Sequence, residues 1–118
     1  MTAVGSYLPS KIVSNEDLSA FVDTDDAWIR RRTGIAQRHF VAKGETTADM
    51  AKHAADKALV NAGLTGDDID MIIVATTTPD NTFPSTATKL QYLIGAKTAV
   101  AFDIQAVCAG FIYALDIA

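Results

Sequence analysis

Alternating helix and strand patterns over residues 46–118 constrain the fold of this chain more than any other feature. In the stretch 46–63, small apolar residues recur at three- and four-residue steps, which predicts an amphipathic helix. Thr46 with Asp49 fits a capping box at its start, and a glycine follows its last turn. The apolar run 71–75 is rich in β-branched residues and predicts a parallel strand buried on both faces.

The same alternation continues along the rest of the chain. Ser85 and Gly95 are placed to begin and end a second helix. Residues 98–104 predict a short buried strand, and 108–118 predict a nearly all-apolar helix. The order helix, strand, helix, strand, helix favours right-handed βαβ connections and a sheet with helices on both faces. No repeat or linker divides the chain, so we expect one α/β domain over residues 1–118.

Cys108 is the only cysteine of the chain and lies where a predicted strand passes into a predicted helix. Ligands of such sheets bind beyond the carboxyl ends of the strands. Helix N-termini favour the thiolate form of a cysteine, and the small neighbours Ala106, Ala109 and Gly110 would let a carbonyl approach backbone donors. A buried, inert cysteine is equally compatible with these local features, so both interpretations stay open.

Other candidate catalytic groups are few. A hydrolase-type nucleophile elbow is disfavoured, because it requires glycine where Ala106 stands. His39 and His53 are the only imidazoles, and neither has a sequence cue that ties it to the cysteine. From the residues alone, Phe83 is interpreted as a packing anchor in a loop.

Charge and hydropathy exclude several classes of protein. The 118 residues carry a net charge of −4, which argues against a nucleic-acid-binding domain. No apolar run is long enough to span a membrane and no secretory signal is evident, so we expect a cytoplasmic protein that binds no membrane. All four arginines lie between residues 30 and 38, close to Trp28. This segment predicts either an anion site or, as physical chemistry alone favours, a helix with dipole-complementing charges and Trp28 packed inward.

Four separated stretches resemble β-ketoacyl-acyl carrier protein synthase III, in the same order and over nearly the whole chain. They are GSYLPSKIVSNEDL, VDTDDAWIRRRTGIAQRHF, IIVATTTPDNTFPSTA and FDIQAVCAGFIYAL. The resemblance implies a thiolase-like αβαβα fold, of which residues 1–118 would be the first half. It further implies that Cys108 takes an acyl group from acyl-CoA, commonly acetyl-CoA, before condensation with malonyl-acyl carrier protein starts type II fatty acid synthesis.

The same resemblance assigns residues to substrate binding. Trp28 would stack on the adenine of coenzyme A, with Thr24 and Arg32 nearby. Phe83 would reach across a homodimer interface toward the partner's acyl pocket and favour short acyl groups. No cofactor or metal is implied beyond the coenzyme A thioester substrate.

Several residues depart from the family pattern, and much of the family's length is not matched. Ala27, Arg30 and Arg31 are unusual, and Gln105 and Val107 replace the small residues usual before the nucleophile. The family is more than twice as long, its catalytic histidine and asparagine lie in the second half, and the chain begins within the usual first strand. We therefore expect a catalytically incomplete fragment that requires the missing C-terminal half.

Two other functions remain as alternatives at this stage. One is another acyl-CoA condensing enzyme of the superfamily, such as a 3-hydroxy-3-methylglutaryl-CoA synthase or a long-chain acyl condensing homologue. The other is a non-catalytic binding or assembly module with a buried cysteine. The acceptor substrate would distinguish the first alternative, and the reactivity of the thiol would distinguish the second.

Overall fold

The computed structural model describes all residues 1–118 and divides into two compact units. Unit 1 comprises residues 1–7 and 46–118, and unit 2 comprises residues 8–45. No linker composition marks either boundary in the sequence. The expectation that residues 1–118 make up one half of a larger fold stays a prediction.

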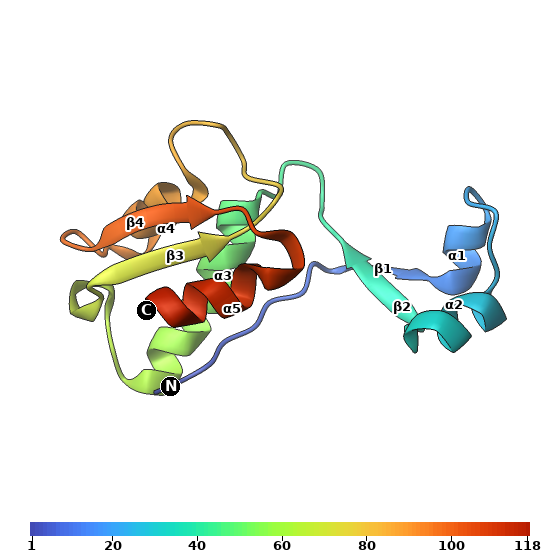
Figure 1. Ribbon diagram of the computed structural model, residues 1–118, viewed down its shortest axis with the longest axis horizontal. Helices are drawn as coiled ribbons and strands as arrows, with labels where there is room; N and C mark the ends of the chain where they lie inside the picture. Colours follow the sequence, from blue (N-terminus) through green and yellow to red (C-terminus); the bar gives the residue numbers. More distant parts are fainter. The chain divides into compact units, whose positions relative to one another are not determined.

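Unit 1 contains the alternating elements that the sequence predicts (Figure 1). In chain order they are α3 (Thr47–Ala62), the 3₁₀ turn η1 (Gly66–Asp68), β3 (Met71–Ala75), α4 (Thr86–Ile94), β4 (Val100–Ile104), the 3₁₀ turn η2 (Val107–Ala109) and α5 (Gly110–Ile117). Strands β3 and β4 are parallel, with Met71 opposite Val100 and Ala75 opposite Ile104. The predicted order and the parallel pairing are therefore confirmed.

The helix ends of unit 1 form at the residues that the sequence marks. The Thr46 hydroxyl accepts from the Asp49 amide at 3.2 Å, and the Asp49 carboxylate accepts from the Thr46 amide at 3.0 Å. Gly63 and Gly95 end α3 and α4 in the left-handed region, with φ of 68° and 74°, and Ser85 caps α4. No helix combines the length and the apolar character needed to cross a lipid bilayer.

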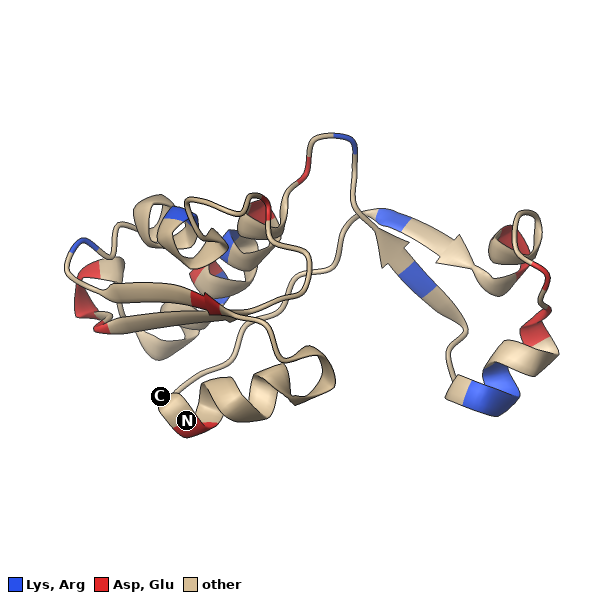
Figure 2. Cartoon of the chain, turned by 45° about the horizontal axis from the view of Figure 1, so that its top comes forward, with Lys and Arg blue, Asp and Glu red and all other residues tan.

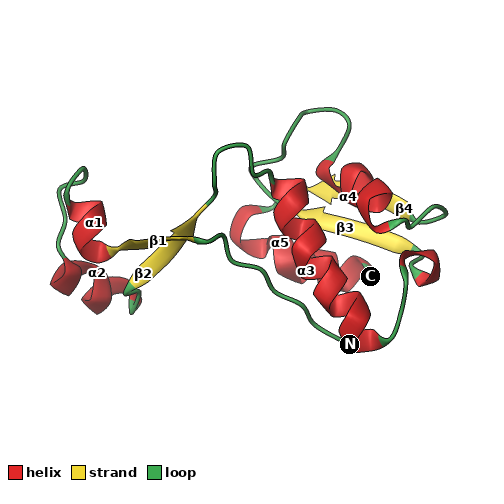
Figure 3. Cartoon of the chain, turned by 180° about the vertical axis from the view of Figure 1, so that it is seen from behind, coloured by secondary structure: helices red, strands yellow, loops and turns green.

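Helices cover both faces of β3, as expected (Figure 3). On one face Ile72 packs with Ala87 and Leu90 of α4 in the core of unit 1, against which α3 also packs. Alternate side chains of a strand point to opposite faces, and on the other face Ala75 lies against α5. Burial on both faces is incomplete within these residues, because Met71 is 43% exposed.

Unit 2 contains one predicted helix and three elements that the sequence did not reveal. They are β1 (Lys11–Ser14), α1 (Asn15–Ser19), the predicted helix α2 (Asp26–Thr33) and β2 (Gln37–Phe40). Strands β1 and β2 pair antiparallel, with Lys11 opposite Phe40. Residues 1–9 form no strand, and the part in unit 1 lies along α3, where a side chain at Gly5 would collide with the Ala54 carbonyl.

A buried amide joins three segments of unit 2. Asn15 is fully buried, and its Nδ2 donates to Asp26 Oδ1 at 2.7 Å and to the Ile35 carbonyl at 2.9 Å. Its Oδ1 accepts from Arg38 Nη2 at 2.6 Å. Helix α2, the turn after it and β2 are therefore all held to the first residue of α1.

Replacing this amide should loosen unit 2 selectively. Asn15→Ala removes the donor to two acceptors and the acceptor of a guanidinium, and we expect it to lower the opening free energy of unit 2 by about 2–3 kcal/mol. Native-state hydrogen exchange of unit 2 amides in the full-length protein measures this loss. The control Asn61→Ala removes an exposed amide bonded to the Val4 carbonyl and should cost less than about 1 kcal/mol. Equal losses in both variants would show that burial of Asn15 is unimportant.

Candidate active site

Cys108 lies in η2, between the end of β4 and the start of α5. Its thiol is exposed, so it is not the buried packing residue that one interpretation of the sequence allowed. The predicted position, at the carboxyl end of a parallel strand and before a helix, is confirmed. A nucleophile placed here can be reached by a substrate without opening the core.

The residue before the cysteine has a strained backbone. Val107 has a φ of 46° and is the only residue other than glycine with a positive φ in the chain. A β-branched side chain in this region is rare, and such strain costs about 1–3 kcal/mol. No sequence pattern predicts this conformation, because valine is among the residues least expected to adopt it. The strand, strained turn and helix have the layout of a nucleophile elbow, with the strain one residue before Cys108.

Two hollows of unit 1 are lined by Cys108. The first has a volume of about 360 Å³, and its other lining residues are Ala75, Thr76, Thr77, Ala106, Val107 and Gly110. The second has a volume of about 570 Å³ and lies between β3 and α5. A Cβ atom on Gly110 would lie 3.1 Å from the Ala75 Cβ, so the glycine allows α5 to approach β3 closely. This contact shows that Gly110 serves the packing of α5 on β3, whereas the expectation that small residues let a substrate carbonyl approach backbone donors stays a prediction.

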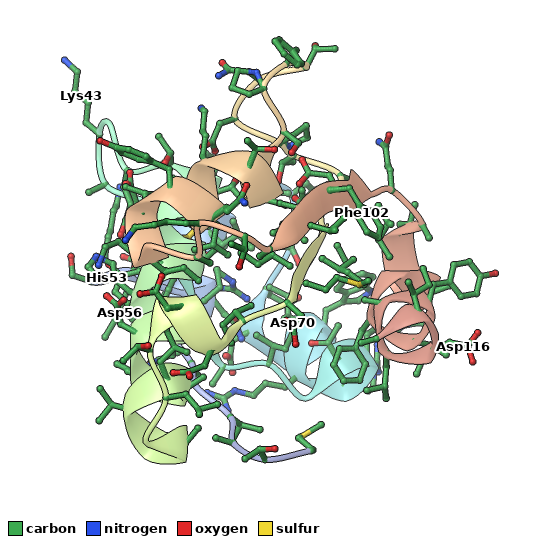
Figure 4. The ribbon with its side chains drawn as sticks, turned by 90° about the vertical axis from the view of Figure 1, so that its left-hand side faces the viewer. Lys43, His53, Asp56, Asp70, Phe102 and Asp116 are labelled. Carbon is green, nitrogen blue, oxygen red and sulfur yellow. The ribbon has the colours of Figure 1, made fainter.

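Neither histidine lines these hollows. His53 lies on α3, with its ring centroid 4.7 Å from that of Tyr7. Figure 4 shows His53 and Asp56 on one side of unit 1 and Asp116 of α5 on the opposite side. In unit 2, His39 Nδ1 lies 2.6 Å from the Pro9 carbonyl oxygen. Both imidazoles therefore have local contacts unrelated to the cysteine.

Phe83 is not a packing anchor within this chain. Its side chain is 88% exposed, at the tip of the loop between β3 and α4. It lines a hollow of about 620 Å³ with residues of that loop and of β4. Thr76 lines both this hollow and the smaller Cys108 hollow, so the two share a wall.

Two aspartates that the sequence did not single out hold this loop in place. Asp103 of β4 accepts from the Thr86 amide at 2.8 Å through Oδ2 and from the Ala87 amide at 2.7 Å through Oδ1. Asp80 accepts from the Thr47 amide at 2.7 Å and so caps α3. These partners are distant in sequence, so no local pattern could identify them.

Helix α2 of unit 2 presents an aromatic and a guanidinium side by side. The Arg32 Cζ lies 5.7 Å from the centroid of the Trp28 ring, and this ring is 49% exposed rather than packed inward. The Asp25 side chain caps the helix by accepting from the Trp28 amide at 2.7 Å. Thr24 Oγ1 is buried without a hydrogen-bond partner. The three residues that the resemblance assigned to coenzyme A thus lie in one short segment of unit 2.

Basic residues colour much of α2 blue in Figure 2, and the three arginines of this helix have different partners. Arg30 Nε donates to both carboxylate oxygens of Asp26 at 2.8 Å. Arg31 forms no hydrogen bond, ion pair or ring contact within the chain. The hydrogen bond from Asn15, followed by that from Arg30, holds the pKa of Asp26 below its ordinary value of 3.8. Arg31 and Arg32 are therefore the positive charges of α2 that have no carboxylate partner.

Solved structures with this fold are thiolase-like condensing enzymes, and two of them are especially similar to the chain. The 3-oxoacyl-[acyl-carrier-protein] synthase III of Aquifex aeolicus is 49% identical, with a TM-score of 0.93 over 98% of this chain and 37% of that one. The priming β-ketosynthase of the R1128 polyketide pathway is 38% identical, with a TM-score of 0.93 over 99% of this chain and 35% of that one. The fold is thus the first part of a thiolase-like α/β fold.

Curated relatives match nearly the whole chain. The β-ketoacyl-[acyl-carrier-protein] synthase III of Paramagnetospirillum magneticum is 60% identical over 114 residues, which are 97% of this chain and 35% of the relative. The Caulobacter vibrioides protein of the same name is 58% identical over 118 residues, all of this chain and 37% of the relative. No protein-family model matches. The chain is similar over nearly all of its length to the N-terminal portion of β-ketoacyl-acyl carrier protein synthase III proteins, and it spans 35% to 37% of these relatives.

Acidification should weaken unit 2 through Asp26. A carboxyl with a depressed pKa stabilises the fold fully above its unfolded pKa of about 4, and this contribution is lost as the pH falls through the lower folded value. We expect a carboxyl-carbon NMR titration of Asp26 to have its midpoint below 3.8 and to move upward in Arg30→Gln. The control Arg31→Gln should leave it unchanged, because Arg31 does not contact Asp26. Equal shifts in both variants would indicate a general charge effect.

Proposed function

We propose that this chain supplies the nucleophile and part of the acyl-CoA site of a β-ketoacyl-acyl carrier protein synthase III. The reaction is a decarboxylative condensation that joins the acyl group of acyl-CoA, commonly acetyl-CoA, to malonyl-acyl carrier protein. It is the first condensation of type II fatty acid synthesis. The observation that carries this proposal is the exposed thiol of Cys108 in a strained turn beside a hollow. The identity to named synthases supports it.

In the first half-reaction, the Cys108 thiolate attacks the thioester carbonyl of acyl-CoA. The tetrahedral oxyanion collapses, the coenzyme A thiolate leaves and takes up a proton, and the acyl group stays on sulfur as a thioester. Cys108 lies just before α5, and the first N–H groups of a helix have no intrahelical acceptor. The Ala109 and Gly110 amides already donate to the Ala106 and Val107 carbonyls, so the donor for the developing oxyanion is proposed to be another amide near this turn.

In the second half-reaction, malonyl-acyl carrier protein loses carbon dioxide and forms an enolate. The enolate carbon attacks the acyl-cysteine carbonyl, the bond to Cys108 breaks, and the thiolate is regenerated with 3-ketoacyl-acyl carrier protein as product. The chemistry requires no metal or prosthetic group, because the malonyl group generates its own carbanion. Neither histidine lines the Cys108 hollows, so the donors that stabilise the enolate are assigned to residues beyond these 118.

Unit 2 is proposed to bind the nucleotide end of acyl-CoA. The half-exposed Trp28 ring offers a face for adenine, and the Arg32 guanidinium can pair with a phosphate or close over the base. The Thr24 hydroxyl is buried and has no partner in the chain, so it can bond acyl-CoA only when binding exposes it. The three residues together supply stacking, charge and a polar contact.

Phe83 is proposed to border the acyl site across the interface of a homodimer. Its exposure at a loop tip fits a residue that contacts another subunit, and its bulk would limit acyl length. The enzyme would act in the cytoplasm, with acyl-CoA and an acyl carrier protein as its partners. A condensing enzyme for a different acceptor and a non-catalytic module are disfavoured by the relatives at 58% to 60% identity and by the exposed thiol.

Cys108→Ala should abolish acylation of the full-length protein by acetyl-CoA while the fold is retained. The thiol is exposed and contributes little to the core, so only the nucleophile is removed. Intact-mass spectrometry after incubation measures one added acetyl group per wild-type chain and none in the variant. Thermal unfolding provides the control for folding. Persistent acylation of the variant would place the nucleophile elsewhere.

Trp28→Ala should weaken the use of acyl-CoA by about 1–3 kcal/mol, the usual contribution of an aromatic ring stacked on a base. Values of kcat/KM for acetyl-CoA measure the loss, and acetyl-pantetheine, which lacks adenine, should be nearly insensitive. Tyr92→Ala is the control, because Tyr92 is another exposed aromatic, at 86% against 49% for Trp28, and lies in unit 1 and not in the proposed nucleotide site of unit 2. Equal losses with both thioesters would show that Trp28 is a packing residue.

A further inference from the structure

The loop that carries Phe83 is anchored at both ends and free at its tip. Asp80 lies three residues before Phe83 and caps α3, and Thr86 lies three residues after it and donates to Asp103. The Asp80 amide also donates to Thr86 Oγ1 at 3.4 Å, which closes the base of the loop. The Phe83 ring itself is 88% exposed.

We propose that Asp103 and Asp80 are positioning residues that fix the Phe83 loop on unit 1, and thereby set where Phe83 meets the acyl site of the partner subunit and which acyl-chain lengths the enzyme accepts. This inference rests on the proposed acyl-pocket role of Phe83. Neither aspartate is assigned to substrate contact. Both act through the backbone of the Phe83 loop.

Asp103 connects the loop to the strand that leads to the nucleophile. It lies on β4, five residues before Cys108, and each of its carboxylate oxygens accepts one amide at the start of α4. Thr86 and Ala87 are fully buried, so water cannot replace this acceptor. An asparagine offers only one acceptor oxygen and must lose one of the two bonds. Asp103→Asn should therefore loosen the link between Cys108 and the Phe83 loop.

Asp80 anchors the other end of the loop to a different helix. Its side chain is 6% exposed, and Oδ1 accepts from the Thr47 amide at 2.7 Å. Oδ2 lies 3.3 Å from the Ala48 amide and 3.4 Å from Lys89 Nζ. The carboxylate thus joins the loop to α3 and α4 at once. Asp80→Asn removes the charge and one acceptor, so the loop loses its second anchor while its sequence around Phe83 is unchanged.

The test compares the selectivity of the full-length enzyme for acetyl-CoA over hexanoyl-CoA, expressed as the ratio of kcat/KM values. Asp103→Asn and Asp80→Asn should each lower this ratio by about threefold to tenfold, the effect of one lost hydrogen bond on positioning. Phe83→Ala should lower it by about tenfold or more. Adding Asp103→Asn to Phe83→Ala should not change the selectivity ratio further, because the Phe83 ring that Asp103 positions is already absent.

Asp68→Asn is the matched control. Asp68 also accepts a backbone amide at a helix start, from Thr65 at 2.8 Å, but it belongs to η1 and not to the Phe83 loop. The ratio should not change in this variant. If Asp103→Asn does not fold, as judged by thermal unfolding, Asp80→Asn provides the same test at the other end of the loop.

Four results would overturn the inference. Equal losses with both substrates in Asp103→Asn and Asp80→Asn would show a purely structural role. A change in Asp68→Asn as large as theirs would show a general effect of stability. An effect of Asp103→Asn that adds fully to that of Phe83→Ala would show that it does not act through Phe83. If Phe83→Ala alone leaves the ratio unchanged, Phe83 does not limit acyl length, and the inference fails together with the proposed role of Phe83. The proposed reaction is tested separately, by acylation of Cys108.

Discussion

The arrangement of unit 1 depends on one carboxylate placed at the start of a helix. The first amides of a helix lack intrahelical acceptors, and those of Thr86 and Ala87 are buried beyond the reach of water. Asp103 supplies both acceptors from the neighbouring strand, at 2.8 Å and 2.7 Å. Helix α4 is thereby fixed to β4, its Leu90 is held in the core beside Ile72, and the turn with the cysteine follows from the same strand.

Much of unit 1 could be predicted from the sequence because its signals are local. Thr46, Ser85 and Gly95 mark helix ends through bonds or backbone angles that involve only residues close in the chain. The apolar run of β3 gives the same bounds, Met71–Ala75, in the sequence and in the structure. The position of Cys108 could be predicted as well, because it lies between β4 and α5, and both elements were predicted from the sequence.

The features that were missed depend on contacts between distant residues or on an unfavourable local state. In the sequence, Asn15 looks like an ordinary polar residue. Its importance follows only from its side-chain hydrogen bonds with Asp26, Ile35 and Arg38, which are distant in the chain. The pairing of β1 with β2 joins two short polar segments without clear alternation. Val107 has a positive φ, which is unfavourable for valine. Strain of this kind is retained only where the surrounding structure enforces it.

The antiparallel pairing of β1 and β2 has an evolutionary consequence. It sets Lys11 opposite Phe40, so unit 2 begins and ends at the same place on its own ladder. When the first and last residues of an inserted segment lie next to each other, the segment can be lengthened, shortened or exchanged without disrupting the rest of the fold. The proposed coenzyme A-binding residues of unit 2 and the cysteine turn of unit 1 can therefore diverge at different rates, because they lie in separate units of the chain.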